Sequence, residues 1–217
     1  MIDALSNKFR FDPSRCVSLD LFDYLLPDNC IPNTAQFSTT EPIIVAGNLS
    51  ALKAGYLYSN ELPFDVNLYG VNFDSSCATP KLNYFGSFLP DELPFVMRGS
   101  FGLVWDGDSC STCSGNNGMY LRVNNSHKAS LYLACGIPVI VWSKSALAPL
   151  VEKSGVGFTV DSLSEVPSVI WALDEPTIQH MYLETRKMSK KLRSGFYLKS
   201  ALNRVKSNLV KRAYSNG

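Results

Sequence analysis

The sequence lacks the features that would place it in a membrane or among nucleic-acid binders. No apolar run approaches the roughly 20 residues that a membrane-spanning helix needs, and the first eight residues, M-I-D-A-L-S-N-K, do not form a signal peptide. The 20 lysines and arginines are balanced by 19 aspartates and glutamates, which leaves a net charge of +1. Because nucleic-acid binders carry a strong basic excess, the sequence predicts a cytoplasmic protein that binds no nucleic acid.

Three nucleotide-binding and metal-binding patterns are also missing. The dinucleotide fingerprint G-x-G-x-x-G and the Walker A loop are absent, which argues against a Rossmann-type dehydrogenase and an NTPase. Of the six cysteines, only Cys110 and Cys113 are closely spaced, and no second Cys or His pair accompanies them. Because a structural zinc site needs four ligands, we expect reduced thiols, with a zinc site as the lesser alternative.

The chain does contain the pattern of an α/β domain. Its 217 residues, 46% of them hydrophobic, are enough for one domain with a substantial core. Apolar segments predict strands at 43–46, 64–71, 83–86, 101–105, 137–141 and 157–160. Helices are predicted at 48–59, from Pro90, at 145–154 and at 162–173, and two more at 175–192 and 196–214. We therefore predict a Rossmann-like three-layer sandwich with a mostly parallel sheet and a helical C-terminal third.

The first 40 residues do not show the pattern of the α/β domain. A short helix at 1–11 and a short strand at 16–21 precede a stretch rich in Pro, Asn, Ser and Thr, which is typical of a linker. We interpret residues 1–40 as a remnant or linker from an N-terminal domain and residues 41–217 as the domain itself.

Residues 124–141 form the unit around which the domain is organised. Asn125 or Ser126 can cap a helix that Gly136 ends, and an apolar strand follows. Lys128 lies in the first turn, where the helix dipole disfavours a cation unless an anion lies between them. Phosphate is the anion that fits this position best.

A second lysine follows a similar pattern. A buried strand ends at Gly47, where the backbone can turn sharply, and Lys53 lies in the next helix. Phosphate sites use this arrangement, although a solvated surface lysine is the alternative.

Four motifs, taken in order, resemble one family. They are G-N-L-S-A-L-K (47–53), N-Y-F-G-S-F-L-P-D-E-L-P (83–94), F-G-L-V-W-D-G (101–107) and N-N-S-H-K (124–128). Together with the sequence H-K-A-S-L-Y-L-A-C-G-I-P-V, they resemble the C-terminal, donor-binding half of GT-B glycosyltransferases. The similarity is greatest to bacterial hexosyltransferases that extend O-linked GlcNAc on serine-rich adhesins and to β-1,6-galactofuranosyltransferases.

This resemblance implies a UDP-hexose site. Lys128 would stabilise the leaving diphosphate, and nucleotide or diphosphate contacts would come from Gly47, Asn48, Leu49, Lys53, Tyr84, Asn124, Asn125, His127, Lys128, Ser130 and Leu131. Asp106 would contact the sugar or ribose. Three of these residues have a structural alternative to a binding role. Tyr84 could pack in the core, His127 could cap the helix, and Asp106 could be a turn residue.

The resemblance also bears on metals and partners. Leu131 stands where many relatives have a ribose-binding glutamate, so ribose contacts would fall to the loop at Asn48. The resemblance implies metal-independent transfer, so no divalent ion or other cofactor is expected, although D-G-D (106–108) has the D-x-D spacing of metal-dependent transferases. A general base would lie in the N-terminal domain, which acts on a glycan or glycoprotein acceptor. The alternative is a nucleotide-sugar-binding module without catalysis.

The sequence does not decide which partner the last predicted helix contacts. It is basic, and could contact anionic lipid, cross to the N-terminal domain as in GT-B folds, or simply be a solvated face. An oligomer remains possible.

Overall fold

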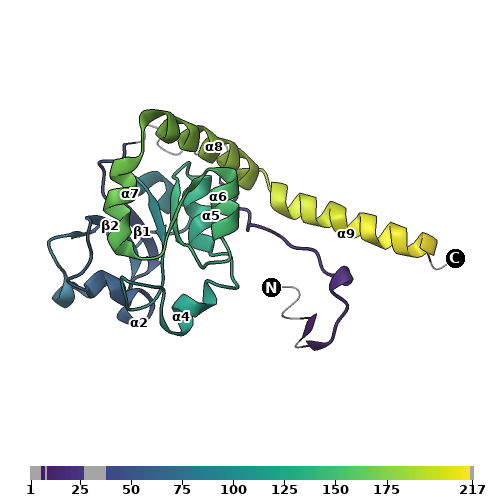
Figure 1. The fold of residues 1–217 in the computed structure, drawn as a ribbon, viewed down its shortest axis with the longest axis horizontal. Helices are drawn as coiled ribbons and strands as arrows, with labels where there is room; N and C mark the ends of the chain where they lie inside the picture. The colour runs from purple at the N-terminus through teal and green to yellow at the C-terminus, as the bar shows by residue number, and fades with distance from the viewer. Residues whose placement is uncertain (1–5, 8, 27–37, 216–217) are drawn as a thin grey trace.

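The protein is an α/β sandwich built on one parallel sheet, with a long helix that extends away from it (Figure 1). The structure, a computed structural model, describes residues 6–7, 9–26 and 38–215, with side chains described as far as residue 211. All pairings between the six strands are parallel, and their order in the sheet is β3-β2-β1-β4-β5-β6. The strands are β1 (Ile43–Asn48), β2 (Val66–Val71), β3 (Leu82–Tyr84), β4 (Gly102–Val104), β5 (Val139–Trp142) and β6 (Gly157–Val160).

The central strands are buried on both faces. Every residue of β4 and β5 is buried, as are the first four of β1, so their sequences are continuous apolar runs rather than alternating ones. Trp105 and Trp142, at the ends of β4 and β5, are among the largest fully buried side chains. The core therefore extends to the carboxyl edge of the sheet.

Helices cover both faces of the sheet. Helix α5 (His127–Ala134) is almost wholly buried, because it packs against β4 and β5 on one side and against α8 on the other. The other α-helices are α2 (Ala51–Ala54), α3 (Leu93–Val96), α4 (Gly115–Tyr120), α6 (Ala148–Ser154), α7 (Val166–Ala172), α8 (Glu175–Arg193) and α9 (Phe196–Ser215). Short 3-10 turns are η1 (Pro13–Arg15), η2 (Gly55–Tyr58), η3 (Ser75–Cys77) and η4 (Leu163–Glu165).

The segment before residue 27 runs beside the last helix. The carboxylate of Asp23 accepts the amide hydrogens of Tyr197 (3.1 Å) and Leu198 (2.8 Å), and so caps the start of α9. Arg204 on α9 donates to the carbonyl of Ser18 at 2.6 Å. In Figure 1 this purple segment and the yellow helix leave the α/β body in the same direction.

The predicted architecture is confirmed, and the sheet is parallel throughout rather than mostly so. Strand 157–160 has the predicted bounds, and Gly136 adopts the expected left-handed conformation, with φ of 75°. The helices of the C-terminal third match their predicted ranges within a residue or two.

Three local predictions were wrong. Residues 16–21 form no strand, because they lie along α9 and have no strand to pair with. The helix predicted from Pro90 starts at Leu93, with Pro94 in its first turn. The helix predicted over 48–59 is α-helical only at Ala51–Ala54, since the next residues bond to Gly107 instead.

Three other predictions fall wholly or partly outside the described residues: the helix at 1–11, the linker before residue 40, and Cys30. The division of the chain at residue 40 stays a prediction. Within the described part of the chain, no helix has the length and apolar character needed to cross a bilayer.

Candidate functional site

Two lysines from separate elements meet on one buried carboxylate at the carboxyl edge of the sheet. Asp106 follows β4, and its Oδ1 and Oδ2 accept bonds from the Nζ atoms of Lys128 and Lys53, each at 2.8 Å. The Asp106 side chain is only 4% exposed, whereas those of Lys128 and Lys53 are 13% and 27% exposed. The cluster carries a net charge of +1, and its exposed surface belongs mainly to the two lysine side chains.

The start of α5 positions Lys128. Ser126 is the N-cap, and its hydroxyl accepts the amide hydrogen of Lys128 at 3.3 Å. The Lys128 side chain then runs past the end of β1, where a Cβ on Gly47 would lie 3.7 Å from the Lys128 Cε. Gly47 has φ of 123°, a conformation that favours glycine. A side chain at position 47 would therefore strain the backbone, and its Cβ would contact the lysine stem.

Gly107 positions Lys53. Its amide donates to the Lys53 carbonyl at 2.9 Å, and its carbonyl accepts from the Tyr56 amide at 3.2 Å. These bonds join the end of α2 to the turn after β4, so Lys53 is held beside Asp106. Gly107 has φ of 115°, and an added Cβ would lie within 2.7 Å of Ser114 atoms. Glycine is therefore required here on steric grounds.

Buried aromatic hydroxyls lie beneath the cluster. The Tyr132 hydroxyl oxygen accepts the amide hydrogen of Ala46 at 2.7 Å, which joins α5 to β1. The Tyr56 hydroxyl is buried and has no hydrogen-bond partner among the described residues. Burial raises the pKa of both tyrosines well above the ordinary value of 10, and the negative charge of Asp106 adds to this increase. These residues stay neutral and shield one side of Asp106 from water.

Cys113 lies on the same buried side. Burial raises the pKa of its thiol to about 12, while a hydrogen bond from the Asp106 backbone acts in the opposite direction. Cys110 is also buried, and both thiols are free. Among the described residues, no group of three or more His, Cys, Asp and Glu side chains is arranged to hold a metal ion. Metal independence stays a prediction.

The predicted residues Asn48 and Tyr84 are the last residues of β1 and β3, so they lie at the carboxyl edge of the sheet. The Asn48 side chain accepts from the Ser50 amide (3.0 Å) and from the Asn72 side chain (3.1 Å). Tyr84 is 44% exposed, and its hydroxyl donates to the Gly70 carbonyl at 2.9 Å. Leu49 is fully buried, with its amide and carbonyl both bonded within the protein. Asn48 and Tyr84 thus lie on an accessible rim, and Leu49 belongs to the core below it.

Two residues predicted at the start of α5 contact the N-terminal segment instead of the lysines. The Asn125 side chain donates to the Asp20 carbonyl, and the His127 ring stacks on Phe22, with 4.2 Å between centroids and 15° between planes. Asn124 is half-buried, and Ser130 and Leu131 are buried within α5. The Ser130 hydroxyl has no partner among the described residues.

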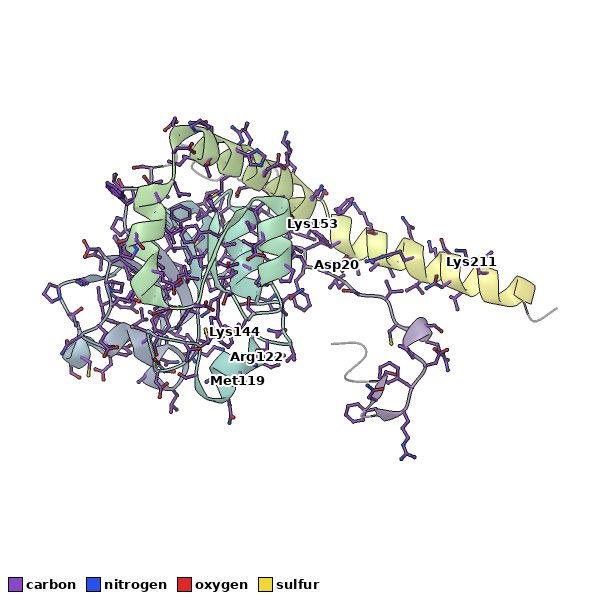
Figure 2. All side chains as sticks on the ribbon, in the orientation of Figure 1. Asp20, Met119, Arg122, Lys144, Lys153 and Lys211 are labelled. Carbon is purple, nitrogen blue, oxygen red and sulfur yellow. The ribbon has the colours of Figure 1, made fainter. Side chains whose placement is uncertain are left out.

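One further cation at this edge was not predicted. The Arg122 guanidinium lies over the Trp142 ring, 5.1 Å from its centroid, so it stands at the end of β5 next to β4. Figure 2 shows Arg122 and Lys144 at the end of the molecule where α4 lies. No motif surrounds Arg122 in the sequence, and only the fold brings it to the sheet edge. The same is true of Tyr56 and Tyr132.

Residues 43–205 match the family model described as "Glucosyltransferase 3-like, C-terminal domain". The chain belongs to this family. The match covers all six strands, both lysines of the cluster and half of α9. The resemblance found in the four motifs is therefore confirmed.

Curated relatives of known name are similar over much of the chain. The β-1,6-galactofuranosyltransferase WbbI of Escherichia coli K12 is 34% identical over 194 residues, which are 89% of this chain and 58% of that protein. Glucosyltransferase 3 of Streptococcus gordonii is 37% identical over 113 residues, or 52% of this chain and 33% of that protein. The chain thus spans little more than half the length of the first relative and a third of the second.

Solved structures with similar folds are more distant. Sucrose-phosphate synthase from Thermosynechococcus elongatus has a TM-score of 0.47 and 15% identity, over 93% of this chain and 52% of that chain. Anabaena HepE, solved with UDP and glucose, has a TM-score of 0.46 and 15% identity, over 88% of this chain and 55% of that chain.

Proposed function

We propose that this chain is the donor-binding half of a glycosyltransferase that uses a UDP-hexose. Membership of the family supports the class of reaction. The main support for the binding site is that Lys53 and Lys128 converge on the same carboxylate, with each Nζ atom 2.8 Å from an Asp106 oxygen. A nucleotide sugar would place its diphosphate against these two ammonium groups, on their solvent side. Asp106 then acts as the residue that holds both lysines in place rather than as a sugar contact.

The charges favour a diphosphate over a weaker anion. Two cations held together by one carboxylate keep an excess positive charge, and both lysine side chains are partly exposed. Each has donor capacity left, because a lysine ammonium has three hydrogens. The dipole of α5 adds partial positive charge at its first turn, beside Lys128. A dianionic group therefore complements this site better than a sugar hydroxyl does.

The same groups have a chemical role in the transfer. When the anomeric bond breaks, negative charge grows on the departing diphosphate, and preorganised cations lower the energy of that state. Lys128 is the more buried of the two lysines, so its charge is screened less by water. We propose that Lys128 stabilises the leaving group, that Lys53 assists it, and that no metal ion is required.

The remaining parts of the reaction belong to another domain. A general base and the binding site for a glycan or glycoprotein acceptor would come from an N-terminal domain, as the fuller length of the relatives implies. This chain alone would then bind donor and turn it over slowly or not at all. A cytoplasmic location fits a UDP-sugar substrate.

Thermal unfolding with a panel of UDP, GDP, ADP and UDP-hexoses tests this proposal. A ligand at a hundred times its dissociation constant stabilises the folded state by about 2.7 kcal/mol, or roughly 5–10 °C in melting temperature for a chain of this size. We expect UDP and at least one UDP-hexose to give such a shift and Lys128→Ala to remove it. Lys190→Ala, which alters an exposed lysine on α8, is the matched control.

Two results would contradict the proposal. An equal UDP shift in Lys128→Ala and the unaltered chain would place the diphosphate elsewhere. Equal shifts with UDP, GDP and ADP would remove the assignment of the nucleotide.

The second candidate is a nucleotide-sugar-binding module without catalysis. Transfer that appears when the N-terminal half of a relative is added, and that Lys128→Ala abolishes, would favour the transferase. UDP binding without transfer in such a mixture, and in a fused full-length chain, would favour the module.

A further inference from the structure

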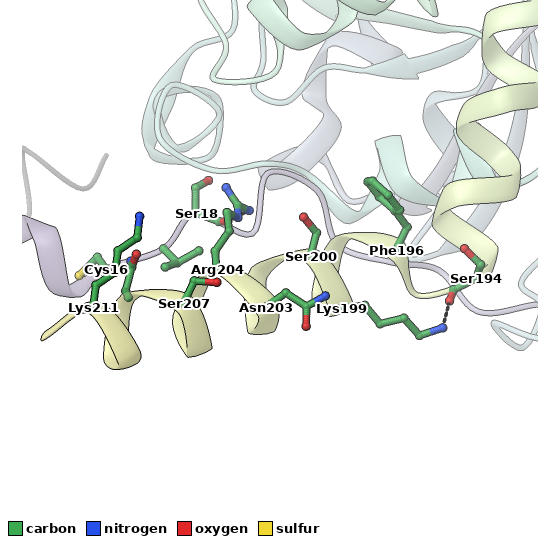
Figure 3. Close-up of a pocket in the computed structure, with 12 residues that line it drawn as sticks. Cys16, Ser18, Ser194, Phe196, Lys199, Ser200, Asn203, Arg204, Ser207 and Lys211 are labelled. Atoms are coloured by element: carbon green, nitrogen blue, oxygen red, sulfur yellow. Dashed lines mark hydrogen bonds between the residues drawn. The ribbon is translucent and has the colours of Figure 1, made fainter. Parts of the chain in front are cut away.

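The two strands beside the lysine cluster separate before they reach it. A cavity of about 730 Å³ lies between residues 16–18 and α9 (Figure 3), but none of its lining residues belongs to the cluster. The room at the cluster has another origin, the junction of β1 and β4. The strand order β3-β2-β1-β4-β5-β6 reverses its direction at this junction, and ligands of open α/β sheets bind at such a point.

The ladder between β1 and β4 is a single pair. Within the described part of the chain, these strands pair only at Ile44 and Gly102, whereas β1 pairs with β2 over six residues and β4 with β5 over three. The Ile44 amide donates to the Phe101 carbonyl at 2.8 Å. Because amides alternate between the two neighbours of a strand, the next amide directed at β4 is that of Ala46. It donates to the Tyr132 hydroxyl oxygen instead, at 2.7 Å.

Gly102 leaves the room in which the Tyr132 ring lies. A Cβ on Gly102 would be 2.2 Å from the Tyr132 Cγ, so the ring packs directly on the residue of β4 that pairs with β1. Tyr132 is fully buried, and its ring carries the hydroxyl from α5 to the Ala46 amide. The hydroxyl thus takes the place of a strand-to-strand bond, and β1 and β4 stay apart towards their carboxyl ends.

Lys128 lies at the opening between the strands. It precedes Tyr132 by four residues on α5, so both side chains lie on the same face of the helix. The Lys128 Cε would be 3.7 Å from a Cβ on Gly47 in β1, and the Lys128 Nζ donates to the Trp105 carbonyl, just after β4, at 3.4 Å. The side chain therefore lies beside both strands where they separate, and from there its Nζ donates to Asp106 at 2.8 Å.

We propose that Tyr132 is a positioning residue for the donor diphosphate: its hydroxyl holds β1 and β4 apart, and this opening sets the place of the Lys128 ammonium group. The inference rests on the proposed function, because it concerns the placement of a lysine that binds diphosphate. Without the hydroxyl, the Ala46 amide would bond across the ladder to β4 or lose its partner, and the strands would shift around Lys128. Since Tyr132 is fully buried, it acts through Lys128 and not on the ligand.

Titration calorimetry of Tyr132→Phe with UDP and with uridine tests this proposal. The substitution keeps the ring on Gly102 and removes only the hydroxyl. We expect UDP affinity to fall about three- to tenfold, less than on complete loss of the charge-assisted bond from Lys128, and uridine affinity to stay unchanged. A general loss of folded structure would lower both affinities.

Tyr69→Phe is the matched control. Tyr69 is also fully buried, and its hydroxyl oxygen also accepts a backbone amide hydrogen, from Arg98 at 3.0 Å. It belongs to β2 and takes no part in the junction of β1 and β4. Thermal unfolding without ligand should show a similar loss of stability in the two variants, but only Tyr132→Phe should weaken UDP binding.

A double-mutant cycle separates positioning through Lys128 from an independent effect. In the Lys128→Ala background, Tyr132→Phe should change UDP affinity by less than about twofold, because the side chain that it positions is absent. An equal loss of affinity from Tyr132→Phe in both backgrounds would overturn the proposal. Unchanged UDP affinity in Tyr132→Phe, or a parallel fall in uridine affinity, would overturn it as well.

The two proposals fail in different ways. If Lys128→Ala loses UDP affinity while Tyr132→Phe keeps it, the donor site stands and the positioning role falls. If Lys128→Ala binds UDP as the unaltered chain does, the proposed function falls, and the role of Tyr132 falls with it.

Discussion

Asp106 is the residue on which the arrangement of the site depends. A carboxylate that is 4% exposed loses most of its hydration, and the two ammonium groups at 2.8 Å offset that loss. The position of Asp106 after a strand predicts that it lies at the sheet edge, but not whether its side chain points to solvent or inward. The backbone bonds of Gly107 to residues 53 and 56 bring Lys53 to the Asp106 carboxylate, and the sequence does not show these bonds.

Asp106→Asn tests this role. The neutral amide cannot compensate two adjacent ammonium groups, so we expect the free energy of unfolding to fall by about 2 kcal/mol, less than for a fully buried pair because Lys53 is partly exposed. UDP should then stabilise the variant more than the unaltered chain, since the diphosphate replaces the lost anion. Urea unfolding with and without UDP measures both quantities.

Asp91→Asn, at an exposed acid, is the control for this experiment and should leave the unfolding free energy unchanged. If Asp106→Asn were as stable as the unaltered chain, the carboxylate would not be holding the lysines.

At the scale of elements, α5 combines a polar start with a buried body. Ser126 caps the helix, Lys128 lies in its first turn, and from Ala129 to Ala134 every residue is buried. This unit was predicted well, because the cap, the glycine stop and the following apolar strand are all local signals. Helix α2 was predicted poorly, because the turn that ends it comes from bonds to Gly107, more than fifty residues away.

Ser126→Ala tests the cap. The loss of a capping hydroxyl costs about 1 kcal/mol, or about 2–4 °C in melting temperature for a chain of this size. We expect UDP affinity to fall as well, because the first turn carries Lys128. Calorimetry, with Ser168→Ala on the exposed side of α7 as control, measures the shift. An unchanged melting temperature would show that the cap contributes nothing.

For the whole molecule, the parallel sheet and the site at its carboxyl edge were predicted from apolar runs bounded by glycines. What the sequence could not predict depends on contacts between distant segments. The extension of β1 to Asn48 comes from pairing with Gly70 and Val71, and residues 16–21 have no partner strand. The unpredicted neighbours of the site, Tyr56, Tyr132 and Arg122, carry no motif. Their positions follow only from packing.

The buried thiol and tyrosine hydroxyls beneath the site predict that the free energy of unfolding falls at alkaline pH. The pKa values of Cys113, Tyr56 and Tyr132 are raised in the folded state, so above about pH 9 the unfolded chain loses protons that the folded chain keeps. Their contribution to stability is complete below the unfolded pKa values and falls as pH rises from about 9 towards 12. Urea unfolding at pH 8, 9 and 10 should show this fall.

Cys113→Ala should reduce the fall between pH 9 and 10, where the thiol is the first of these groups to ionise in the unfolded chain. Cys77→Ala, at an exposed thiol, should not. Stability that stayed constant to pH 10 in all three chains would contradict the burial of these groups.

The central claim is that Lys53 and Lys128 bind one diphosphate, and titration calorimetry with UDP and with uridine tests it most directly. We predict that Lys53→Ala and Lys128→Ala each weaken UDP binding at least tenfold, consistent with the loss of a charge-assisted bond of about 1.5–3 kcal/mol, and leave uridine binding unchanged. UDP affinity that survived both substitutions, or uridine affinity that fell in parallel, would contradict the account.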